Sequence, residues 1–264
     1  MFRYYFGVTA WRRRLRRIVV GVGVAAGGVA AGTVVGTRAA YVAGLVAVFG
    51  GLWYAQAALK PLFVPAPWTP AAWRYGPLRH ALDVADADRW LDVGTGTGRS
   101  LVGLAESRDE NAPEAAGDRW PADVTAVDDF DRFGVGPLGR DAATRAERNA
   151  ETAGLSVDAV RGDPSRLPVE SGSQDVVTAC GVLSELDEPA AETALSEARR
   201  VLRDDGQFGV LAAPGRRGGE ADAADPLAYW SDALESAGFT VDVSGAVSRG
   251  DARYCYLACS VGSR

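Results

Sequence analysis

The pattern of hydrophobic and polar residues divides the chain into two parts. Two runs, Ile18–Gly36 and Tyr41–Leu59, each hold 19 residues without a charged side chain, and a short turn that contains Arg38 separates them. Each run approaches the roughly 20 apolar residues that a helix needs to cross a bilayer core of about 30 Å. We therefore predict two transmembrane helices, with spans at about 18–37 and 39–59.

Beyond residue 85, short apolar segments alternate with amphipathic ones, as strands and helices do in an α/β domain. Strands are expected at 89–93, 124–128, 156–161, 175–180, 207–213, 240–247 and 253–261, and helices at 100–107, 141–153, 190–202 and 227–237. The last two strands are joined by a turn too short for a crossover, so they must be antiparallel. The pattern predicts a doubly wound parallel sheet that ends in an antiparallel hairpin, within a domain at 85–264.

Residues 61–84 are expected to connect the two parts beside the membrane. Prolines at positions 61, 65, 67 and 70 interrupt regular structure at the start of this segment. The remainder, 71–84, is predicted to form one helix that leads into the first strand.

Charge is distributed as unevenly as hydrophobicity. Residues 1–60 contain eight basic and no acidic side chains, whereas the other 204 residues hold 20 basic and 34 acidic ones, a net charge of −14. A domain this acidic repels phosphate, so no nucleic-acid partner is expected. Basic residues precede the first span and follow the second, and the turn has only Arg38. By the positive-inside rule, we expect a multi-pass protein of the cell membrane whose N-terminus and large domain are cytoplasmic.

Two other interpretations of residues 1–60 are weaker. A cleaved signal peptide would leave the second apolar run unexplained, and a buried hairpin of a water-soluble protein would show an amphipathic pattern. Gly28, Gly32 and Gly36 recur every four residues, which predicts close backbone contact with the second span near Gly44 and Gly51. The alternative is that these glycines are only small residues in a sequence rich in glycine and alanine.

The most informative motif follows the first predicted strand of the large domain. Residues 90–99 read Trp-Leu-Asp-Val-Gly-Thr-Gly-Thr-Gly-Arg, a strand that ends in Asp92 and a loop with glycine at every second position. A helix follows, so backbone N–H groups can face a nucleotide that approaches closely. Arg99 occupies the position of the third glycine in the dinucleotide fingerprint, and the P-loop lysine is absent. A glycine turn needed only for packing is the alternative.

The sequence Asp-x-Gly-x-Gly-x-Gly at the end of a first strand resembles motif I of class I S-adenosylmethionine-dependent methyltransferases. The helix at 145–155, the acid Asp163 after the third strand and the antiparallel hairpin at the end continue the resemblance over about 85–264. The resemblance implies a seven-stranded Rossmann-like sheet, S-adenosylmethionine as cofactor, and methyl transfer to an acceptor that the sequence does not identify.

The resemblance also implies which residues bind the cofactor. Asp92 would hold the methionine ammonium through water or backbone, Asp128 the ribose, and Asp163 the adenine. The full set of expected cofactor-binding residues is Asp92, Gly94, Thr95, Gly96, Gly98, Asp128, Asp163 and Cys180. Asp128 is preferred to Asp129 because Val127 ends the apolar run. One departure is Pro164, which has no N–H to offer the adenine ring, so either Ser165 substitutes or this contact is missing.

No catalytic base is assigned. The Asn-Pro-Pro-Tyr sequence of amino-nitrogen methylation is absent after the fourth strand. Glu185 and Asp187 are the nearby acids, and they are more simply explained as exposed acids before a helix. One histidine, His80, and three cysteines without paired spacing predict no metal site.

The predicted membrane hairpin favours an acceptor that is a lipid or a quinone-like molecule, or another small molecule held at the bilayer. Two alternatives stay open at this point. One is a non-catalytic membrane adaptor that retains the fold. The other is a nicotinamide-dependent oxidoreductase, which Arg99 disfavours.

Overall fold

The computed structural model describes residues 2–7, 11–59, 66–85, 87–107, 120–121, 123–131, 141–213, 225–250 and 252–262. It forms two compact units. The first consists of Met1–Thr69 and Arg132–Arg140, and the second of Pro70–Asp131 and Asp141–Arg264.

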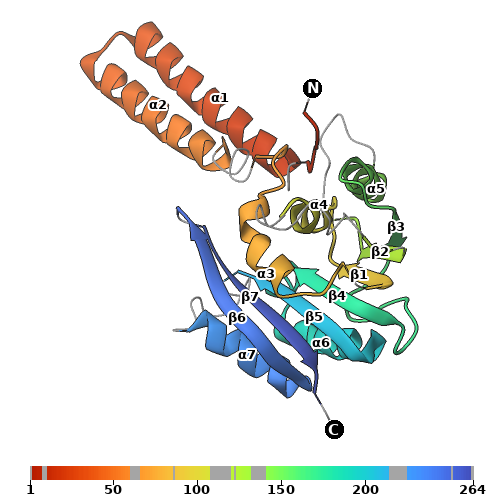
Figure 1. The fold of residues 1–264 in the computed structure, drawn as a ribbon. Helices are drawn as coiled ribbons and strands as arrows, with labels where there is room; N and C mark the ends of the chain where they lie inside the picture. The colour runs from red at the N-terminus through yellow and green to blue at the C-terminus, as the bar shows by residue number, and fades with distance from the viewer. Residues whose placement is uncertain are drawn as a thin grey trace. The chain divides into compact units, whose positions relative to one another are not determined.

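The first unit is dominated by a helical hairpin (Figure 1). Helix α1 (Trp11–Val35) and helix α2 (Arg38–Leu59) are both long and apolar enough to cross a membrane. The chain reverses at Gly36, whose φ of 67° suits glycine. The Thr37 hydroxyl then accepts a hydrogen bond from the Ala40 N–H (3.2 Å) and caps α2.

The first helix begins earlier than the predicted span. Arg12, Arg13, Arg14, Arg16 and Arg17, expected to precede the span, lie in the first two turns of α1. A helix continues through long, charged side chains as readily as through apolar ones, so apolar composition alone did not locate its start. Lys60, expected after the second span, lies outside the described residues.

Glycines bring α1 and α2 into backbone contact. A Cβ at Gly28 would lie 2.7 Å from the Gly44 carbonyl oxygen, and one at Gly21 would collide with the backbone of Gly51. The predicted contact at Gly28 and Gly44 is therefore confirmed. Gly51 faces Gly21, a partner that the four-residue pattern missed, and Gly32 makes only an ordinary contact with α2.

The second unit contains a seven-stranded sheet with the order β3-β2-β1-β4-β5-β7-β6 (Figure 1). The strands are β1 (Arg89–Val93), β2 (Asp123–Asp128), β3 (Val157–Arg161), β4 (Gln174–Cys180), β5 (Leu202–Ala212), β6 (Phe239–Arg249) and β7 (Ala252–Val261). Strands β1 to β5 are parallel, and β7 pairs antiparallel with both β5 and β6. This confirms the predicted fold, a doubly wound parallel sheet closed by an antiparallel hairpin.

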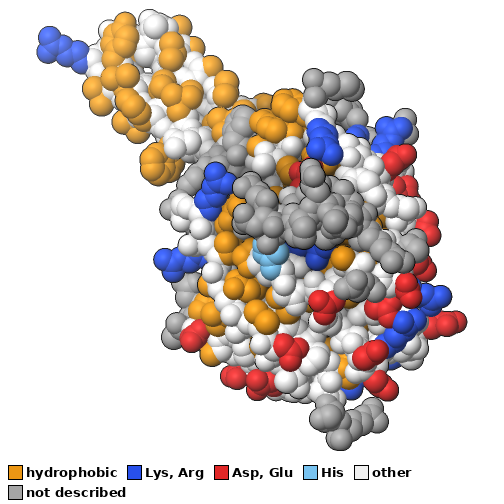
Figure 2. Space-filling model, in the orientation of Figure 1, with side chains coloured by type: hydrophobic (Ala, Val, Ile, Leu, Met, Phe, Trp, Pro, Cys, Tyr) orange, Lys and Arg blue, Asp and Glu red, His pale blue; other side chains and the backbone are white. Residues whose placement is uncertain are grey.

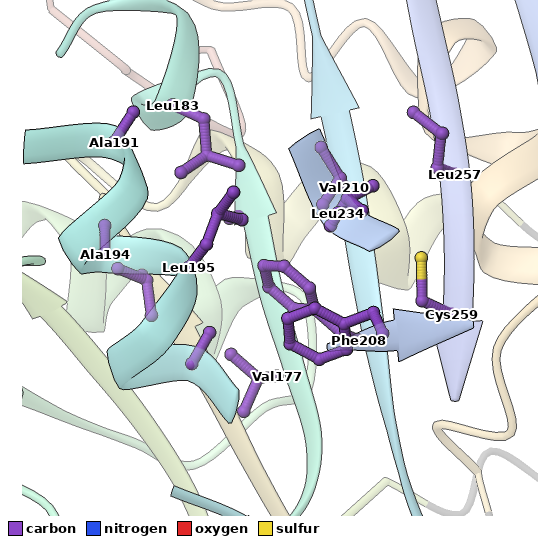
Figure 3. Packing of buried hydrophobic residues seen from close by; sticks show 14 of the residues in the cluster. Val177, Leu183, Ala191, Ala194, Leu195, Phe208, Val210, Leu234, Leu257 and Cys259 are labelled. Atoms are coloured by element: carbon purple, nitrogen blue, oxygen red, sulfur yellow. The ribbon is translucent and has the colours of Figure 1, made fainter. Parts of the chain in front are cut away.

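Helices cover both faces of this sheet. On one face lie η2 (Ala72–Arg74), α3 (Gly76–His80), α4 (Arg99–Glu106) and α5 (Ala142–Thr152). On the other lie η3 (Val182–Ser184), α6 (Glu188–Val201) and α7 (Pro226–Ser236). Figure 3 shows the core on this second face, where Leu195 of α6 and Leu234 of α7 pack against Val177, Phe208 and Val210 of the sheet.

The segment before β1 differs from its prediction. One helix was expected over 71–84, but the structure has the two short helices η2 and α3. Ala71 has a φ of 57°, outside the helical region. Pro77 has no N–H and restricts the residue before it, so one continuous helix cannot form. The prolines at 61 and 65 lie outside the described residues.

The surfaces of the two units are composed differently. On the hairpin, Val34, Phe49 and Trp53 are 84%, 72% and 76% exposed. Figure 2 shows hydrophobic and uncharged side chains over most of the hairpin, whereas acidic side chains gather on the sheet unit.

Candidate active site

The glycine loop lies where β1 ends, at the carboxyl edge of the parallel strands. Gly94, Gly96 and Gly98 have φ values of 75°, 56° and 80°, in the left-handed region that glycine adopts without strain. The Gly94 N–H donates to the Val127 carbonyl (2.7 Å), and the Gly98 N–H donates to the Thr95 carbonyl (2.9 Å). The loop is thus a hydrogen-bonded turn tied to β2 and followed directly by α4.

Two of these glycines are also required by contacts within the chain. A Cβ at Gly94 would collide with the side chain of Val182, in the turn after β4. A Cβ at Gly98 would lie 3.0 Å from the Ala146 carbonyl oxygen of α5. Packing therefore explains part of the glycine pattern, and close approach of a ligand to these positions stays a prediction.

Asp128 is the acid that binds the glycine loop. Its side chain is 7% exposed, and its Oδ2 accepts a hydrogen bond from the Gly96 N–H (2.9 Å). Its Oδ1 accepts from the Phe130 N–H (2.7 Å), while the neighbouring Asp129 accepts from the Asp131 N–H (3.0 Å). Burial raises the pKa of Asp128, and the two backbone hydrogen bonds oppose this rise. Each carboxylate oxygen has a second lone pair, so Asp128 can accept two further hydrogen bonds from hydroxyl groups.

Asp92 is fully buried beneath the loop. Its Oδ1 accepts from the Thr178 hydroxyl (2.6 Å) and its Oδ2 from the Ser100 hydroxyl (2.6 Å). The Trp90 Nε1 donates to the same Thr178 hydroxyl (2.9 Å). Burial raises the pKa of Asp92 to about 6, while hydrogen bonds from Ser100 and Thr178 lower it. Asp92 thus joins β1 to α4 and β4, and its predicted link to a methionine ammonium still requires water or backbone.

Thr95 carries a buried hydroxyl whose hydrogen-bonding capacity the described residues do not fill. Its hydroxyl lies near enough to lower the pKa of Asp92, yet its buried Oγ1 has no partner in hydrogen-bonding geometry among the described residues. Buried hydroxyl groups in proteins are nearly always paired, so a ligand or water is expected here. This donor and the free lone pairs of Asp128 fit a ligand that carries hydroxyl groups.

Asp163 lies in the turn after β3, at the same edge of the sheet. The Asp128 carbonyl accepts from the Gly162 N–H (3.0 Å), which places the Asp163 turn beside the end of β2. Asp163 is exposed, and its Oδ1 accepts a hydrogen bond from the Ser165 N–H (2.8 Å). The N–H that was expected to replace the one missing at Pro164 is therefore already bound to Asp163.

Cys180 ends β4, and its surroundings make its thiol unreactive. Burial raises the pKa of the Cys180 thiol well above its usual range, and the charge of Asp92 adds to this. A protonated thiol is a poor nucleophile.

Asp187 is the N-cap of α6, where its Oδ1 accepts from the Ala190 N–H (3.0 Å). No group of His, Cys, Asp and Glu that could hold a metal occurs among the described residues.

Sequence reasoning missed several residues of this region. Thr178 and Ser100 hold Asp92, and the one available signal for Thr178 was a polar residue inside an apolar strand. Arg74 and Tyr254 are joined by a hydrogen bond (3.2 Å) across 180 residues of sequence. No local pattern signals such a contact.

Comparisons with known proteins match the part of the chain that contains these residues. Residues 91–210 match the family model of a methyltransferase domain. Two similar solved structures are the [4+2]-cyclase SpnF (TM-score 0.53, 21% identity, 75% of this chain and 84% of that chain) and the trans-methyltransferase CalH in complex with SAH (TM-score 0.53, 21% identity, 77% and 62%). A third is the proposed methyltransferase partner of the Haloferax volcanii Trm112 methyltransferase activator (TM-score 0.51, 15% identity, 72% and 90%). A comparison with curated protein sequences gave no match.

The structural likenesses establish the fold. A cyclase shares that fold, so the fold alone does not specify the reaction. The matched segment 91–210 contains the glycine loop, Asp128, Asp163 and Cys180, and the related methyltransferase CalH binds SAH, the demethylated form of S-adenosylmethionine. The chain therefore carries a class I S-adenosylmethionine-dependent methyltransferase domain.

Proposed function

We propose that this chain is a membrane-anchored methyltransferase that transfers a methyl group from S-adenosylmethionine to an acceptor at the cytoplasmic face of the cell membrane. The proposed domains are a transmembrane hairpin at 1–60, a connector at 61–84 and a methyltransferase domain at 85–264. The observation that carries the proposal is that the buried carboxylate of Asp128 accepts a hydrogen bond from the Gly96 N–H and keeps lone pairs for a ribose.

In this proposal the cofactor lies along the carboxyl edge of β1 to β4. Asp128 accepts hydrogen bonds from the ribose hydroxyls, and Asp163 accepts one from the adenine amino group. Thr95 and Gly96 contact the part of the cofactor between these two groups. Gly94 and Gly98 shape the loop, Asp92 orients it through Ser100 and Thr178, and Cys180 contributes an apolar wall. The cofactor supplies a reactive sulfonium methyl group. The chain therefore mainly aligns the reactants and excludes water.

The exposed surface of the hairpin supports the membrane anchor. In both helices only 22% of the most apolar 18-residue window is buried, which differs from the core helix of a water-soluble protein. The basic residues at the start of α1 favour a cytoplasmic N-terminus, and a hairpin returns the chain to the same side. Tethering an enzyme to a bilayer favours an acceptor that resides there, such as a lipid or a quinone-like molecule.

Calorimetry on the full chain in detergent tests the cofactor site. We expect S-adenosylmethionine to bind, NAD not to bind, and Asp128→Ala to weaken S-adenosylmethionine by more than about tenfold, roughly 1.4 kcal/mol. Asp158→Ala, which removes an exposed carboxylate from β3, is the control and should leave the affinity near that of the wild type. An Asp128→Ala variant with the affinity of the wild type would remove Asp128 from the ribose site.

Labelled S-adenosylmethionine tests the location of the acceptor. The full chain is incubated separately with membranes and with the cytosolic fraction of the same cells. We expect label in a product that extracts with the membranes. Label that appears only in soluble products would disprove a membrane-resident acceptor.

A further inference from the structure

Basic and aromatic side chains meet on the α4 face of the sheet, beside the proposed cofactor site. Arg74 donates hydrogen bonds to the hydroxyls of Tyr75 and of Tyr254, the latter at 3.2 Å. Its guanidinium carbon lies 4.6 Å and 5.1 Å from the centres of the same two rings. Trp73 packs edge-on against Tyr254, with ring centres 6.0 Å apart. The Arg74 side chain is thus fixed by two rings and two hydroxyls.

This cluster lies at the same edge of the sheet as the glycine loop. Strand β7 is antiparallel to β5, and Cys255 pairs with Ala212 at the end of β5, so Tyr254 lies just beyond that end. The Tyr75 ring packs on α4 at Gly103, where a Cβ would collide with it. Arg99 lies one turn before Gly103 and therefore on the same side of α4.

Two positive charges come together here. Burial is the main cause that lowers the pKa of Arg99 to about 10; Tyr75 opposes this shift, and the charge of Arg74 contributes to it. Burial also opposes the charge of Arg74, but Tyr75 and Tyr254 outweigh it and raise the pKa of Arg74. Burial raises the pKa of Tyr75 to about 12, so its hydroxyl stays neutral and supplies no counter-charge. Both arginines are therefore cations at pH 7.

Arg74 has donor capacity that the described residues do not use. Its Nε is buried without a hydrogen-bond partner, and it has no carboxylate partner among the described residues. A partly buried cation is unfavourable until an opposite charge joins it. The planar guanidinium fork matches the two oxygens of a carboxylate or a phosphate.

We propose that Arg74, assisted by the charge of Arg99, binds an anionic group of the methyl acceptor, either a carboxylate or a phosphate monoester. This inference rests on the proposed function, because it names the acceptor class of the same site. The rings of Trp73 and Tyr254 then contact the apolar body that carries the anionic group.

The position of Tyr254 favours the acceptor over the cofactor as the source of the anion. In the order β1-β4-β5-β7, strand β7 is three strands from β1, a separation of about 14 Å at the usual spacing of neighbouring strands. Asp128 and Asp163, proposed for the ribose and adenine, lie on the opposite side of β1. The carboxylate of the cofactor is the competing source, and the experiment below separates the two.

The test uses the full chain in detergent, saturated with S-adenosylhomocysteine, and three probes in calorimetric titrations. Benzoate and phenyl phosphate carry the anionic groups, and benzamide is the uncharged counterpart of benzoate. We expect at least one anion to bind about tenfold or more tighter than benzamide, and Arg74→Gln to remove this preference. Arg79→Gln is the matched control, because Arg79 lies on Trp120 and donates to the Leu82 carbonyl. It should retain the preference.

Two results would overturn the proposal. One is equal binding of both anions and benzamide to the wild type. The other is an Arg74→Gln variant that weakens S-adenosylhomocysteine but not methylthioadenosine, which lacks the amino-acid part; the anion would then be the cofactor's own carboxylate. Arg74→Lys retains the charge and should keep part of the preference, and thermal unfolding verifies that each variant is folded.

Failure of the proposed function gives a different result. If S-adenosylhomocysteine does not bind to the wild type, the methyltransferase site fails. The ratio of benzoate to benzamide affinity, measured without the nucleoside in wild type and Arg74→Gln, still decides whether Arg74 binds anions.

Discussion

The hairpin and the sheet unit use similar apolar residues in opposite ways. In the sheet unit the largest side chains, among them Trp90, Trp230 and Phe208, are buried between layers. In the hairpin, Gly28 and Gly44 make the helix contact and side chains such as Phe49 point outward. In water, burying apolar surface stabilises a fold by about 25 cal/mol per Å². In an apolar solvent this driving force is absent and close backbone packing replaces it, which is the arrangement of the hairpin.

The two units also differ in buried charge. Residues 1–60 contain no acidic side chain, whereas the sheet unit buries Asp92 and Asp128 at its carboxyl edge. The hairpin therefore has no carboxylate to satisfy, whereas the sheet unit must keep its buried carboxylates hydrogen-bonded. Each difference can be tested by substitutions in one unit that should leave the other unchanged.

The largest effect is expected in the core of the sheet unit. Trp230 is fully buried, and its Nε1 donates to the Ala213 carbonyl (3.2 Å). We expect Trp230→Ala to lower the free energy of unfolding by about 3–5 kcal/mol, because it leaves a cavity. Asp232→Ala, exposed on the same helix, should change it by less than about 0.5 kcal/mol. Urea unfolding of the full chain in detergent measures both, and similar losses would contradict the assignment of this core.

A pH-dependent effect of intermediate size is expected at Asp92. Its pKa rises on folding from 3.8 to about 6, so the folded state binds the proton more tightly. The contribution of Asp92 to stability is complete below about pH 4 and is lost as the pH rises to about 6, a change of about 3 kcal/mol. Asp92→Asn cannot titrate. Relative to this variant, the wild type should therefore gain stability as the pH falls from 7 to 4. If the free energy of unfolding changes with pH in the same way for both proteins, Asp92 does not titrate in this range.

The smallest effect is expected in the hairpin. Gly28→Val places atoms against the Gly44 carbonyl and should cost about 1–3 kcal/mol by overpacking. Gly27 faces open space, so Gly27→Val is the control. Spin labels at the exposed positions 24 and 46 should move apart only in the Gly28 variant. Unfolding of the sheet unit should stay unchanged in both variants, and a loss there would contradict the separation of the two units.

Much of the fold was predictable because local rules dominate it. Each predicted strand of the sheet unit corresponds to an observed one, since alternation and turn residues are local signals. The helix expected at 71–84 was wrong because apolar spacing outweighed Gly76-Pro77, whose backbone constraints divide the segment. The starts of α1 and β5 were displaced for a related reason. Charged or polar residues at the end of an element give no periodic signal.

The site was less predictable because its contacts connect distant residues. The position of Asp128 beside the glycine loop was predictable, because an acid that ends a strand next to such a loop is a local feature. The hydrogen bond between Asp92 and Thr178 spans 86 residues, and that between Arg74 and Tyr254 spans 180. Such contacts depend on strand order, which places β4 beside β1 and β7 beside β5.

The contact between Gly94 and Val182 changes how a standard mutagenesis experiment would be interpreted. Replacing a motif glycine is commonly used to ask whether a nucleotide touches the loop. Here an added methyl group would first displace Val182, and with it the turn that follows β4. An inactive Gly94→Ala enzyme would therefore report damage to the turn after β4 as much as to a cofactor contact at the loop. Replacing Val182 with glycine in the same chain separates these causes, because it removes the Cβ that an added methyl group at Gly94 would strike, and restored activity would show that crowding was responsible.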